Sequence, residues 1–237
     1  MIPKIIHYCW FGNKEKPDII KRCINSWKEI LSDYEIIEWN EKNYDLFKNK
    51  FCTQAYEQKK FAFVSDVVRL DVMYEYGGIY LDTDVMVYKT FDEILDNKCV
   101  FGFEEKEYVA TSFMAAEKKC EFIERFLEYY QNQTFIKDKK PDMETNVVKL
   151  TKLLLDIGLK KNGEFQVLPS NIVVYPQVYF SPYDYINCYS KRTNETICEH
   201  LFNVSWQSKN QKIKKIIKST ISNLGGYEIL KKLRKED

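Results

Sequence analysis

Residues 62–85 read AFVSDVVRLDVMYEYGGIYLDTDV, and this stretch decides the fold. Apolar side chains recur at helical spacing from about Ala62 to Tyr76, which predicts a helix that the following pair of glycines ends. The apolar run 79–81 predicts a short central strand, and residues 85–88 are expected to continue in an extended conformation. A helix that leads into a buried strand ending in acidic residues is typical of α/β proteins.

The N-terminal segment adds a strand, a helix and a second strand. Residues 4–11 are apolar and end at Gly12, which indicates a buried strand. A helix is predicted from Pro17 to about Ser32, and residues 34–39 predict the next strand. Together with the deciding stretch, this order predicts an α/β fold with one domain over residues 1–206 and an extension over residues 207–237.

Beyond residue 100 the predicted elements are mixed. The patterns favour strands at 100–103, 110–115, 167–169, 172–175 and 201–206, and helices at 121–130 and 144–157. Neither an internal repeat nor a convincing linker divides this region.

Composition excludes several classes of protein. Thirty-six basic and 35 acidic residues give a net charge of +1, which argues against a general polyanion binder and therefore against a nucleic-acid partner. The seven cysteines have neither zinc-ligand spacing nor an even count, so free thiols in a reducing compartment are expected. Without a signal-peptide pattern or a long apolar run, we expect a cytoplasmic protein.

The acidic triplet Asp82-Thr83-Asp84 is the strongest candidate for chemistry. It follows the central strand, and ligands of open α/β folds bind at the carboxyl edge of the sheet. If the chain stays extended, both carboxylates point to the same side. Hard oxygen ligands favour Mg²⁺ or Mn²⁺, with substrate phosphates completing the shell. A solvated turn is the alternative for the triplet on its own.

Three further groups of residues are weaker candidates when each is taken alone. Asp66 and Arg69 share one helical face just before the triplet, where a surface ion pair is the simpler interpretation. His7 and Trp10 close the first strand, and a tryptophan there suits base stacking or a place in the core. Residues 200–206 offer His200, a metal ligand or a structural histidine, followed by polar side chains.

Taken together, these segments resemble glycosyltransferase family 32. The run Ser65–Leu70 and the run Tyr76–Val85 are similar to that family's sugar-nucleotide signature. Residues 2–12 look like its first strand, and His200 to Trp206 resembles its closing segment. The family includes capsule and lipopolysaccharide transferases and mannosyltransferase-like proteins, and the glucosylating bacterial toxins share a similar core.

The resemblance implies a GT-A (Rossmann-like) fold, a divalent metal (Mn²⁺ or Mg²⁺) and retaining transfer of a hexose from a nucleotide sugar. It implies that Asp84 binds the metal directly and that Asp82 reaches it through water. His200 and Asn203 stand where the toxins have a carboxylate, which makes these two the candidates for a further metal ligand. Trp206 would donate its indole N–H to the leaving phosphate.

The resemblance also implies the residues that hold the donor. Trp10 would stack on the base, which favours a UDP-sugar, and Asp66 and Arg69 would hold the hydroxyls of the donor sugar. The remaining residues expected beside the donor are His7, Tyr80, Ser205 and Asp82. The expected acceptor is a lipid-linked or oligosaccharide glycan of surface polysaccharide synthesis, and attack on the same face as the leaving group is favoured because no nucleophile stands out.

Two other functions remain open from the sequence. A non-catalytic nucleotide-sugar-binding scaffold would use the same acidic residues. A phosphatase of the haloacid dehalogenase type also carries D-x-D at a strand end, but it needs a downstream acidic pair, and this chain has no Asp-Asp.

Two consequences can be tested. Replacing Asp84 by Asn should leave the melting temperature unchanged or raise it, because repulsion from Asp82 is relieved. Residues 209–235, with nine basic residues and one acidic residue, predict peripheral membrane contact or a helix packed on the domain.

Overall fold

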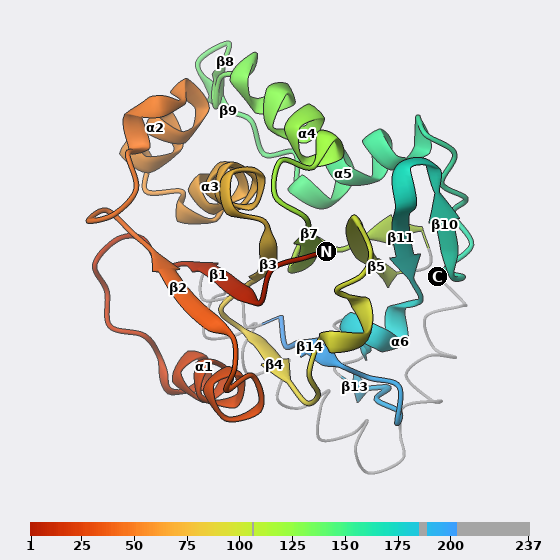
Figure 1. Ribbon diagram of the computed structural model, residues 1–237. Coiled ribbons are helices and arrows are strands. Elements are labelled where there is room, and N and C mark those ends of the chain that lie inside the picture. Colours follow the sequence, from red (N-terminus) through yellow and green to blue (C-terminus); the bar gives the residue numbers. More distant parts are fainter. Residues whose placement is uncertain (106, 185–188, 203–237) are drawn as a thin grey trace, which may run out of the picture.

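A mixed eight-stranded sheet forms the centre of the protein (Figure 1). The computed structural model describes residues 1–105, 107–184 and 189–202. The strand order is β10-β11-β5-β7-β3-β1-β2, and β6 pairs with β5. These strands are β1 (Ile5–Cys9), β2 (Glu35–Trp39), β3 (Gly78–Leu81), β5 (Cys99–Glu105), β6 (Tyr108–Val109), β7 (Phe113–Ala116), β10 (Gln166–Leu168) and β11 (Ile172–Tyr175).

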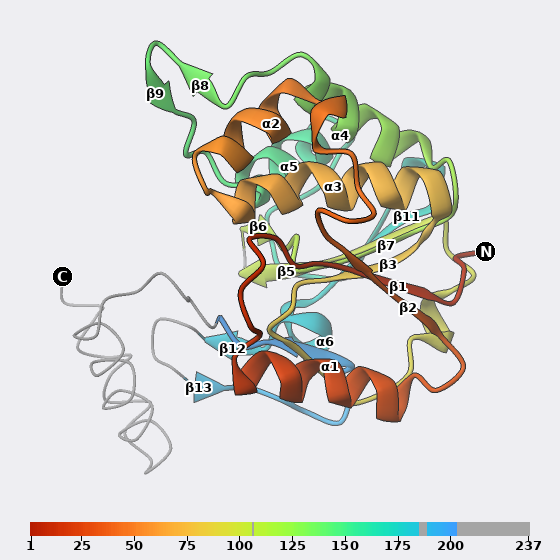
Figure 2. The ribbon, with the colours of Figure 1, turned by 90° about the vertical axis from the view of Figure 1, so that its left-hand side faces the viewer.

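Helices cover both faces of this sheet. Figure 2 shows α2, α3, α4 and α5 on one face and α1 and α6 on the other. The helices are α1 (Asp18–Ile30), α2 (Lys50–Glu57), α3 (Phe61–Tyr76), α4 (Glu121–Gln131), α5 (Asn146–Leu155) and α6 (Gln177–Phe180). Two buried apolar clusters fill the two sides, one including Val68 and Phe126 and the other including Trp27 and Phe113. The expected α/β fold is confirmed.

The first half of the sheet is parallel. β1 pairs in parallel with β2 and with β3, and α1 and α3 lie on opposite faces. This is the Rossmann-like opening that the sequence predicted. β7 is antiparallel to both β3 and β5, so β5 runs in the same direction as β3. The carboxyl ends of β1, β3 and β5 therefore lie at one edge of the sheet.

Gly77 and Gly78 form the junction between α3 and β3. The Gly77 N–H donates to the Met73 carbonyl, and both glycines have positive φ angles of 68° and 104°. A Cβ on Gly77 would lie 2.6 Å from the Lys118 nitrogen, and one on Gly78 would lie 2.6 Å from the Ile5 oxygen. The predicted end of the helix is confirmed, and only glycine fits these positions.

Smaller sheets lie outside the main one. They pair β4 (Val85–Val87) with β14 (Cys198–His200), β8 (Ile136–Lys137) with β9 (Lys140–Pro141), and β12 (Tyr183–Asp184) with β13 (Tyr189–Ser190). The strand expected at 201–206 is wrong at its start: the strand ends at His200, while 203–206 lie outside the described residues. The basic segment 209–235 and the predicted boundary at 206/207 lie outside them as well.

Two further details differ from the sequence-based expectations. Helix α2 was not predicted, and the strand expected at 110–115 begins only at Phe113. The six described cysteines are buried and free. Within the described residues, none of the helices combines the length and the apolar character that a membrane span needs.

Candidate active site at the carboxyl edge of the sheet

The acidic triplet forms a turn directly after β3. The Asp82 N–H donates to the Ser112 carbonyl at 2.8 Å, and the Val85 N–H donates to the Asp82 carbonyl at 3.0 Å. The second bond closes a turn, so the chain does not stay extended through the triplet, and β4 leaves the main sheet. The expectation of two parallel carboxylates on an extended strand is therefore wrong. Each carboxylate has its own set of partners.

Asp82 is held by two buried side chains. The Arg69 Nη2 lies 3.2 Å from Asp82 Oδ1, and the Tyr80 hydroxyl donates to the same oxygen at 3.1 Å. The Arg69 guanidinium carbon lies 4.4 Å from the centre of the Tyr80 ring. Tyr80 is only 1% exposed, so it supports Asp82 and does not reach a donor itself, in contrast to the sequence-based expectation.

Arg69 joins two carboxylates inside the protein. Its Nη2 lies 3.1 Å from Asp66 Oδ1, and its Nη1 donates to the Thr111 carbonyl at 2.6 Å. Its Nε donates to the Ser65 carbonyl. The Asp66–Arg69 pair is thus buried rather than a surface ion pair, and the guanidinium contacts the carboxylates of both Asp66 and Asp82.

Asp66 lies at the inner end of this arrangement. Burial raises the pKa of Asp66 to about 6, while the charge on Arg69 opposes that shift and the charge on Asp82 adds to it. Its side chain keeps 11% of its surface exposed, more than the 4% of Arg69. Of the two residues expected at the donor sugar, Asp66 is therefore the more exposed.

Asp84 is paired with His200. The antiparallel register of β14 on β4 sets His200 opposite Val85, and the His200 Nε2 lies 3.2 Å from Asp84 Oδ1. The Leu201 N–H also donates to the Asp84 carbonyl oxygen. Burial lowers the pKa of His200, but Asp84, Asp82 and Glu104 outweigh it and raise that pKa to about 9.

This pairing bears on two predictions. Without a metal, the His200 Nε2 lies beside Asp84, and the metal-ligand role expected for His200 stays a prediction. Replacing Asp84 by Asn would leave the His200 cation without its partner. The melting temperature should therefore fall in metal-free buffer, not rise as expected from repulsion between the two aspartates.

His7 belongs to the core. It is fully buried, its Nε2 lies 2.8 Å from the Gly77 carbonyl oxygen, and its Nδ1 accepts a hydrogen bond from the Trp39 indole at 3.1 Å. Burial lowers its pKa to about 4, so the ring is neutral. Because both ring nitrogens are engaged, the expectation that His7 binds the donor is wrong.

Trp10 lies just beyond β1 and is half-buried. Its backbone N–H bonds to the Trp39 carbonyl, and its indole N–H donates to the Lys14 carbonyl at 2.7 Å. The Lys16 ammonium lies 5.5 Å from the centre of its ring. The indole hydrogen bond fixes the Trp10 ring beside the carboxyl edge of the sheet. Stacking of this ring on a base stays a prediction.

Glu104 is a residue that sequence reasoning missed. It stands near the end of β5, at the same edge as Asp82, and is half-buried. Burial raises the pKa of Glu104, the charge on His200 opposes that shift, and the charge on Asp82 adds to it, so all three groups interact. The signal was present in the sequence, because an acidic pair follows the apolar strand expected at 100–103.

The carboxyl edge of the sheet with Asp82 and Asp84, called the acidic edge below, supplies part of the ligands that a magnesium or manganese ion needs. Among the described residues, no three His, Cys, Asp or Glu side chains gather as a complete ion site. Mg²⁺ is commonly bound by one or two carboxylates, with waters and substrate phosphates in the other positions. Asp82 and Asp84 supply that number of hard ligands. Asn203, Ser205 and Trp206 lie outside the described residues, so their expected roles remain predictions.

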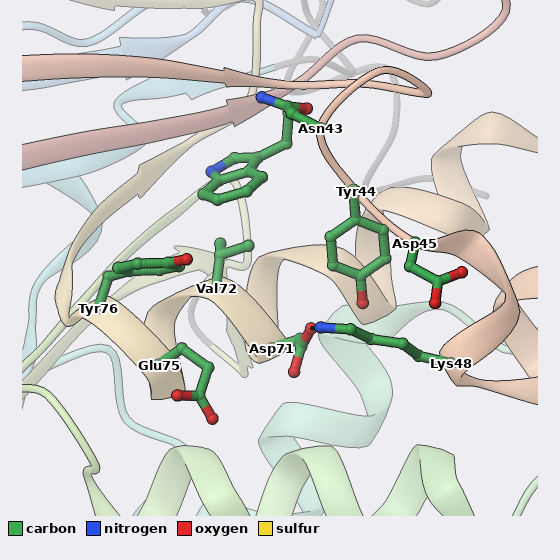
Figure 3. A pocket seen from close by; sticks show the side chains of 9 residues that line it. Asn43, Tyr44, Asp45, Lys48, Asp71, Val72, Glu75 and Tyr76 are labelled. Carbon is green, nitrogen blue, oxygen red and sulfur yellow. Dashed lines mark hydrogen bonds and ion pairs between the residues drawn. The ribbon is translucent and has the colours of Figure 1, made fainter.

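A separate cavity lies on the side of α3 that faces away from Asp66 and Arg69. Its volume is about 220 Å³, and it lies between α3 and the loop after β2 (Figure 3). Three of its charged groups are paired, with Lys48 3.4 Å from Asp71 and Glu75 2.6 Å from Lys119. It includes neither the triplet nor Asp66 nor Arg69, so the candidate site is the acidic edge.

Known proteins share the region that builds this edge. Residues 17–101 match the profile described as "Glycosyltransferase sugar-binding region containing DXD motif". Inositol phosphoceramide mannosyltransferase 3 of Schizosaccharomyces pombe is 34% identical over 102 residues, which are 40% of this chain and 27% of that protein. Inositol phosphoceramide mannosyltransferase 1 of the same yeast is 30% identical over 135 residues, or 52% of this chain and 40% of that protein.

A solved structure is similar at low identity. It is a glycosyltransferase involved in the glycosylation of the major capsid of PBCV-1, with a TM-score of 0.49 and 11% identity over 90% of this chain and 98% of that one. The chain spans less than half the length of the two yeast relatives. The resemblance seen in the sequence is confirmed over residues 17–101, which match a glycosyltransferase sugar-binding region that contains the DXD motif.

Proposed function

We propose that this protein is a metal-dependent glycosyltransferase that moves a hexose from a nucleotide sugar to a glycan or glycolipid acceptor. One observation carries the proposal: Asp82 and Asp84 both follow β3 at the carboxyl edge of the sheet, Asp82 beside the buried Arg69 and Asp84 beside the half-buried His200. Edges of this kind bind ligands in open α/β folds. The match of residues 17–101 to a DXD sugar-binding region supports the same assignment.

In this proposal the three carboxylates have different roles. Asp84 would hold the metal directly and Asp82 would hold it through water, while Arg69 and Tyr80 fix the direction of Asp82. When bound, the ion supplies a Lewis acid that offsets the charge on the departing nucleoside diphosphate. Asp66 accepts hydrogen bonds from hydroxyls of the donor sugar, and Trp10 stacks on the base.

Several finer assignments belong to the proposal. Stacking on Trp10 supports a UDP-sugar, and retention of configuration follows from the family resemblance. Surface polysaccharide synthesis at the cytoplasmic face of a membrane is the proposed setting, with residues 209–235 contacting the bilayer. Trp206 would donate to the leaving phosphate, Ser205 would lie beside it, and His200 or Asn203 would be the further metal ligand.

A lipid acceptor is the second candidate, and a specific finding favours it. The two yeast relatives are named for mannosyl transfer to inositol phosphoceramide. A mannose donor and a sphingolipid acceptor therefore stand beside the UDP-sugar and the lipid-linked glycan.

The experiment is a panel of UDP- and GDP-sugars incubated with the full chain and Mn²⁺, with sugar release followed by chromatography. Slow metal-dependent hydrolysis of one donor is the expected result. Binding of a donor without any hydrolysis or transfer would identify a scaffold instead. Asp71→Asn is the matched control for aspartate variants at the edge. Asp71 also takes part in an ion pair from α3, but it faces away from the edge.

A further inference from the structure

The cavity beside α3 has three aromatic side chains in its lining. They are Trp39 at the end of β2, Tyr44 in the loop that follows and Tyr76 at the end of α3 (Figure 3). The centre of the Trp39 ring lies 6.4 Å from that of Tyr44, with an angle of 86° between the rings, and 5.6 Å from that of Tyr76 at 32°. Tyr76 is 47% exposed, so much of its ring is open to a ligand.

The walls of this cavity are fixed by hydrogen bonds. The Trp39 indole N–H donates to the His7 Nδ1 at 3.1 Å, which holds the ring from the core side. In the loop, the Asn40 N–H donates to Asn43 Oδ1 at 2.9 Å, and the Tyr44 N–H donates to the Asn40 carbonyl at 3.1 Å. A ligand that enters walls already held in place loses less binding free energy to ordering them.

The polar groups of the lining include both acceptors and a strong donor. Asp45, Asp71 and Glu75 offer carboxylate oxygens, and the Lys48 ammonium offers N–H groups. Glu75 pairs with Lys119 at 2.6 Å and Lys48 with Asp71 at 3.4 Å. Both pairs involve exposed side chains and therefore contribute little stability, so a ligand can replace them at small cost.

This set of groups selects the class of ligand. Three carboxylates against one lysine in the lining repel a phosphate or a nucleotide. An organic cation would use the rings and the acceptors, but Lys48 would repel it. A sugar ring presents C–H groups on its faces and hydroxyls that both donate and accept, which matches aromatic walls with mixed polar groups. A volume of about 220 Å³ is below the roughly 300–1,000 Å³ of sites for drug-sized ligands, as suits a single sugar ring.

We propose that this cavity is a second saccharide site, which binds one uncharged pyranose unit with its ring against Tyr76 and its hydroxyls on Glu75 and Lys48. The site is separate from the acidic edge, so the unit that it holds is not the one being transferred. The Trp10 N–H donates to the Trp39 carbonyl at 2.9 Å, so this wall adjoins the rim proposed for the nucleotide. For the source of the sugar unit, an acceptor or product glycan, the inference rests on the proposed function.

Titration with simple glycosides tests the inference without any turnover. The full chain, labelled at the indole nitrogens, is titrated in metal-free buffer with the methyl glycosides of glucose, galactose and mannose, and the Trp39 indole signal is followed by NMR. At least one glycoside should shift this signal in a saturable way. Methyl glucuronide and choline are the charged comparison ligands, and each should bind more weakly than that glycoside.

Variants of the lining give the second readout. Tyr76→Ala removes the exposed ring, and Glu75→Gln keeps the volume but drops the charge. Losing a contact worth about 1 kcal/mol corresponds to about fivefold, so each variant should weaken the glycoside by about fivefold or more. Tyr108→Ala is the matched control, because Tyr108 is an exposed tyrosine on β6 outside the cavity, and it should stay within about twofold of the wild type. Glu75 is exposed, so its variant remains informative if Tyr76→Ala does not fold.

The outcomes separate this site from the proposed transferase function. A Trp39 signal that none of the three glycosides shifts would overturn the saccharide site, as would unchanged affinity in both Tyr76→Ala and Glu75→Gln. Tighter binding of choline than of any glycoside would also overturn it, because the cavity would then be a cation site. If the wild type hydrolyses no nucleotide sugar, the proposed function fails, while the glycoside titration still decides whether the cavity binds a sugar ring.

Discussion

Arg69 on α3 contacts Asp82 beyond β3, with its Nη2 3.2 Å from the Asp82 carboxylate. The same nitrogen lies 3.1 Å from Asp66. One guanidinium therefore balances two half-buried or buried carboxylates and joins the helix to the acidic turn. Arg69 is therefore expected to matter both for the stability of the fold and for the position of Asp82 in the candidate site.

Replacing Arg69 by Met should strongly destabilise the fold. The variant keeps most of the side-chain volume but leaves Asp66 and Asp82 without their cation, and breaking a buried pair costs about 3–5 kcal/mol. Urea unfolding at pH 7 gives the free energy. Lys48→Met, which breaks an exposed pair with Asp71, should cost at most about 1 kcal/mol. Equal, small losses in both variants would show that Arg69 is not a structural link.

Stability should depend on His7 below neutral pH. Burial lowers its pKa to about 4 in the folded state, while the unfolded chain titrates near the ordinary value of 6.5. The unfolded state therefore binds the proton first, so the stability due to neutral His7 is complete above about pH 6.5 and is lost as pH falls toward 4. Unfolding free energies measured across this range should fall less steeply in His7→Gln. If the unfolding free energy of His7→Gln changes with pH as steeply as that of the wild type, groups other than His7 cause the pH dependence.

Trp10 should contribute to nucleotide binding and little to folding. Base stacking on an aromatic side chain is worth about 1–3 kcal/mol, so Trp10→Ala should weaken UDP by that amount while the melting temperature changes little. Calorimetry and a thermal melt measure the two effects. Trp27→Phe is the contrasting variant, because Trp27 is fully buried and donates to the Val85 carbonyl. Unchanged UDP affinity in Trp10→Ala with a large loss of stability would assign Trp10 to the core.

Removing residues 209–237 should abolish binding to anionic vesicles and leave donor hydrolysis intact. Each basic residue near an anionic bilayer contributes about 1 kcal/mol, so the nine in this segment suffice for peripheral attachment. Sedimentation with vesicles, compared between the full chain and the truncated chain, measures the effect. A truncated protein that still sediments, or that unfolds, would contradict the membrane role and favour a helix packed on the domain.

Local patterns predicted the elements that build the edge. The helical spacing before Gly77, the apolar run after Gly78 and the acidic triplet all depend on neighbours in sequence, and α3, β3 and the triplet were found where expected. The conformation of the triplet was not predicted, because its turn depends on a bond from Asp82 to Ser112 on another segment.

The partners of the carboxylates could not be predicted, because they come from distant segments. His200 meets Asp84 only through the register of β14 on β4, and Asp82 meets Arg69 only through the packing of α3 on the sheet. His7 illustrates the opposite error. Its position before Trp10 at a strand end suggested a ligand, whereas its burial between Gly77 and Trp39 makes it a core residue.

The central claim is metal-dependent glycosyl transfer through Asp84, and it is tested most directly by donor turnover of Asp84→Asn beside the wild type. Both are assayed with the best donor of the panel, after chelator treatment and after adding back Mn²⁺. The wild type should be inactive until Mn²⁺ is restored. Asp84→Asn should turn over at least about a hundredfold more slowly, equivalent to roughly 2.7 kcal/mol. Near-normal turnover by the variant in chelator-treated buffer would contradict the claim.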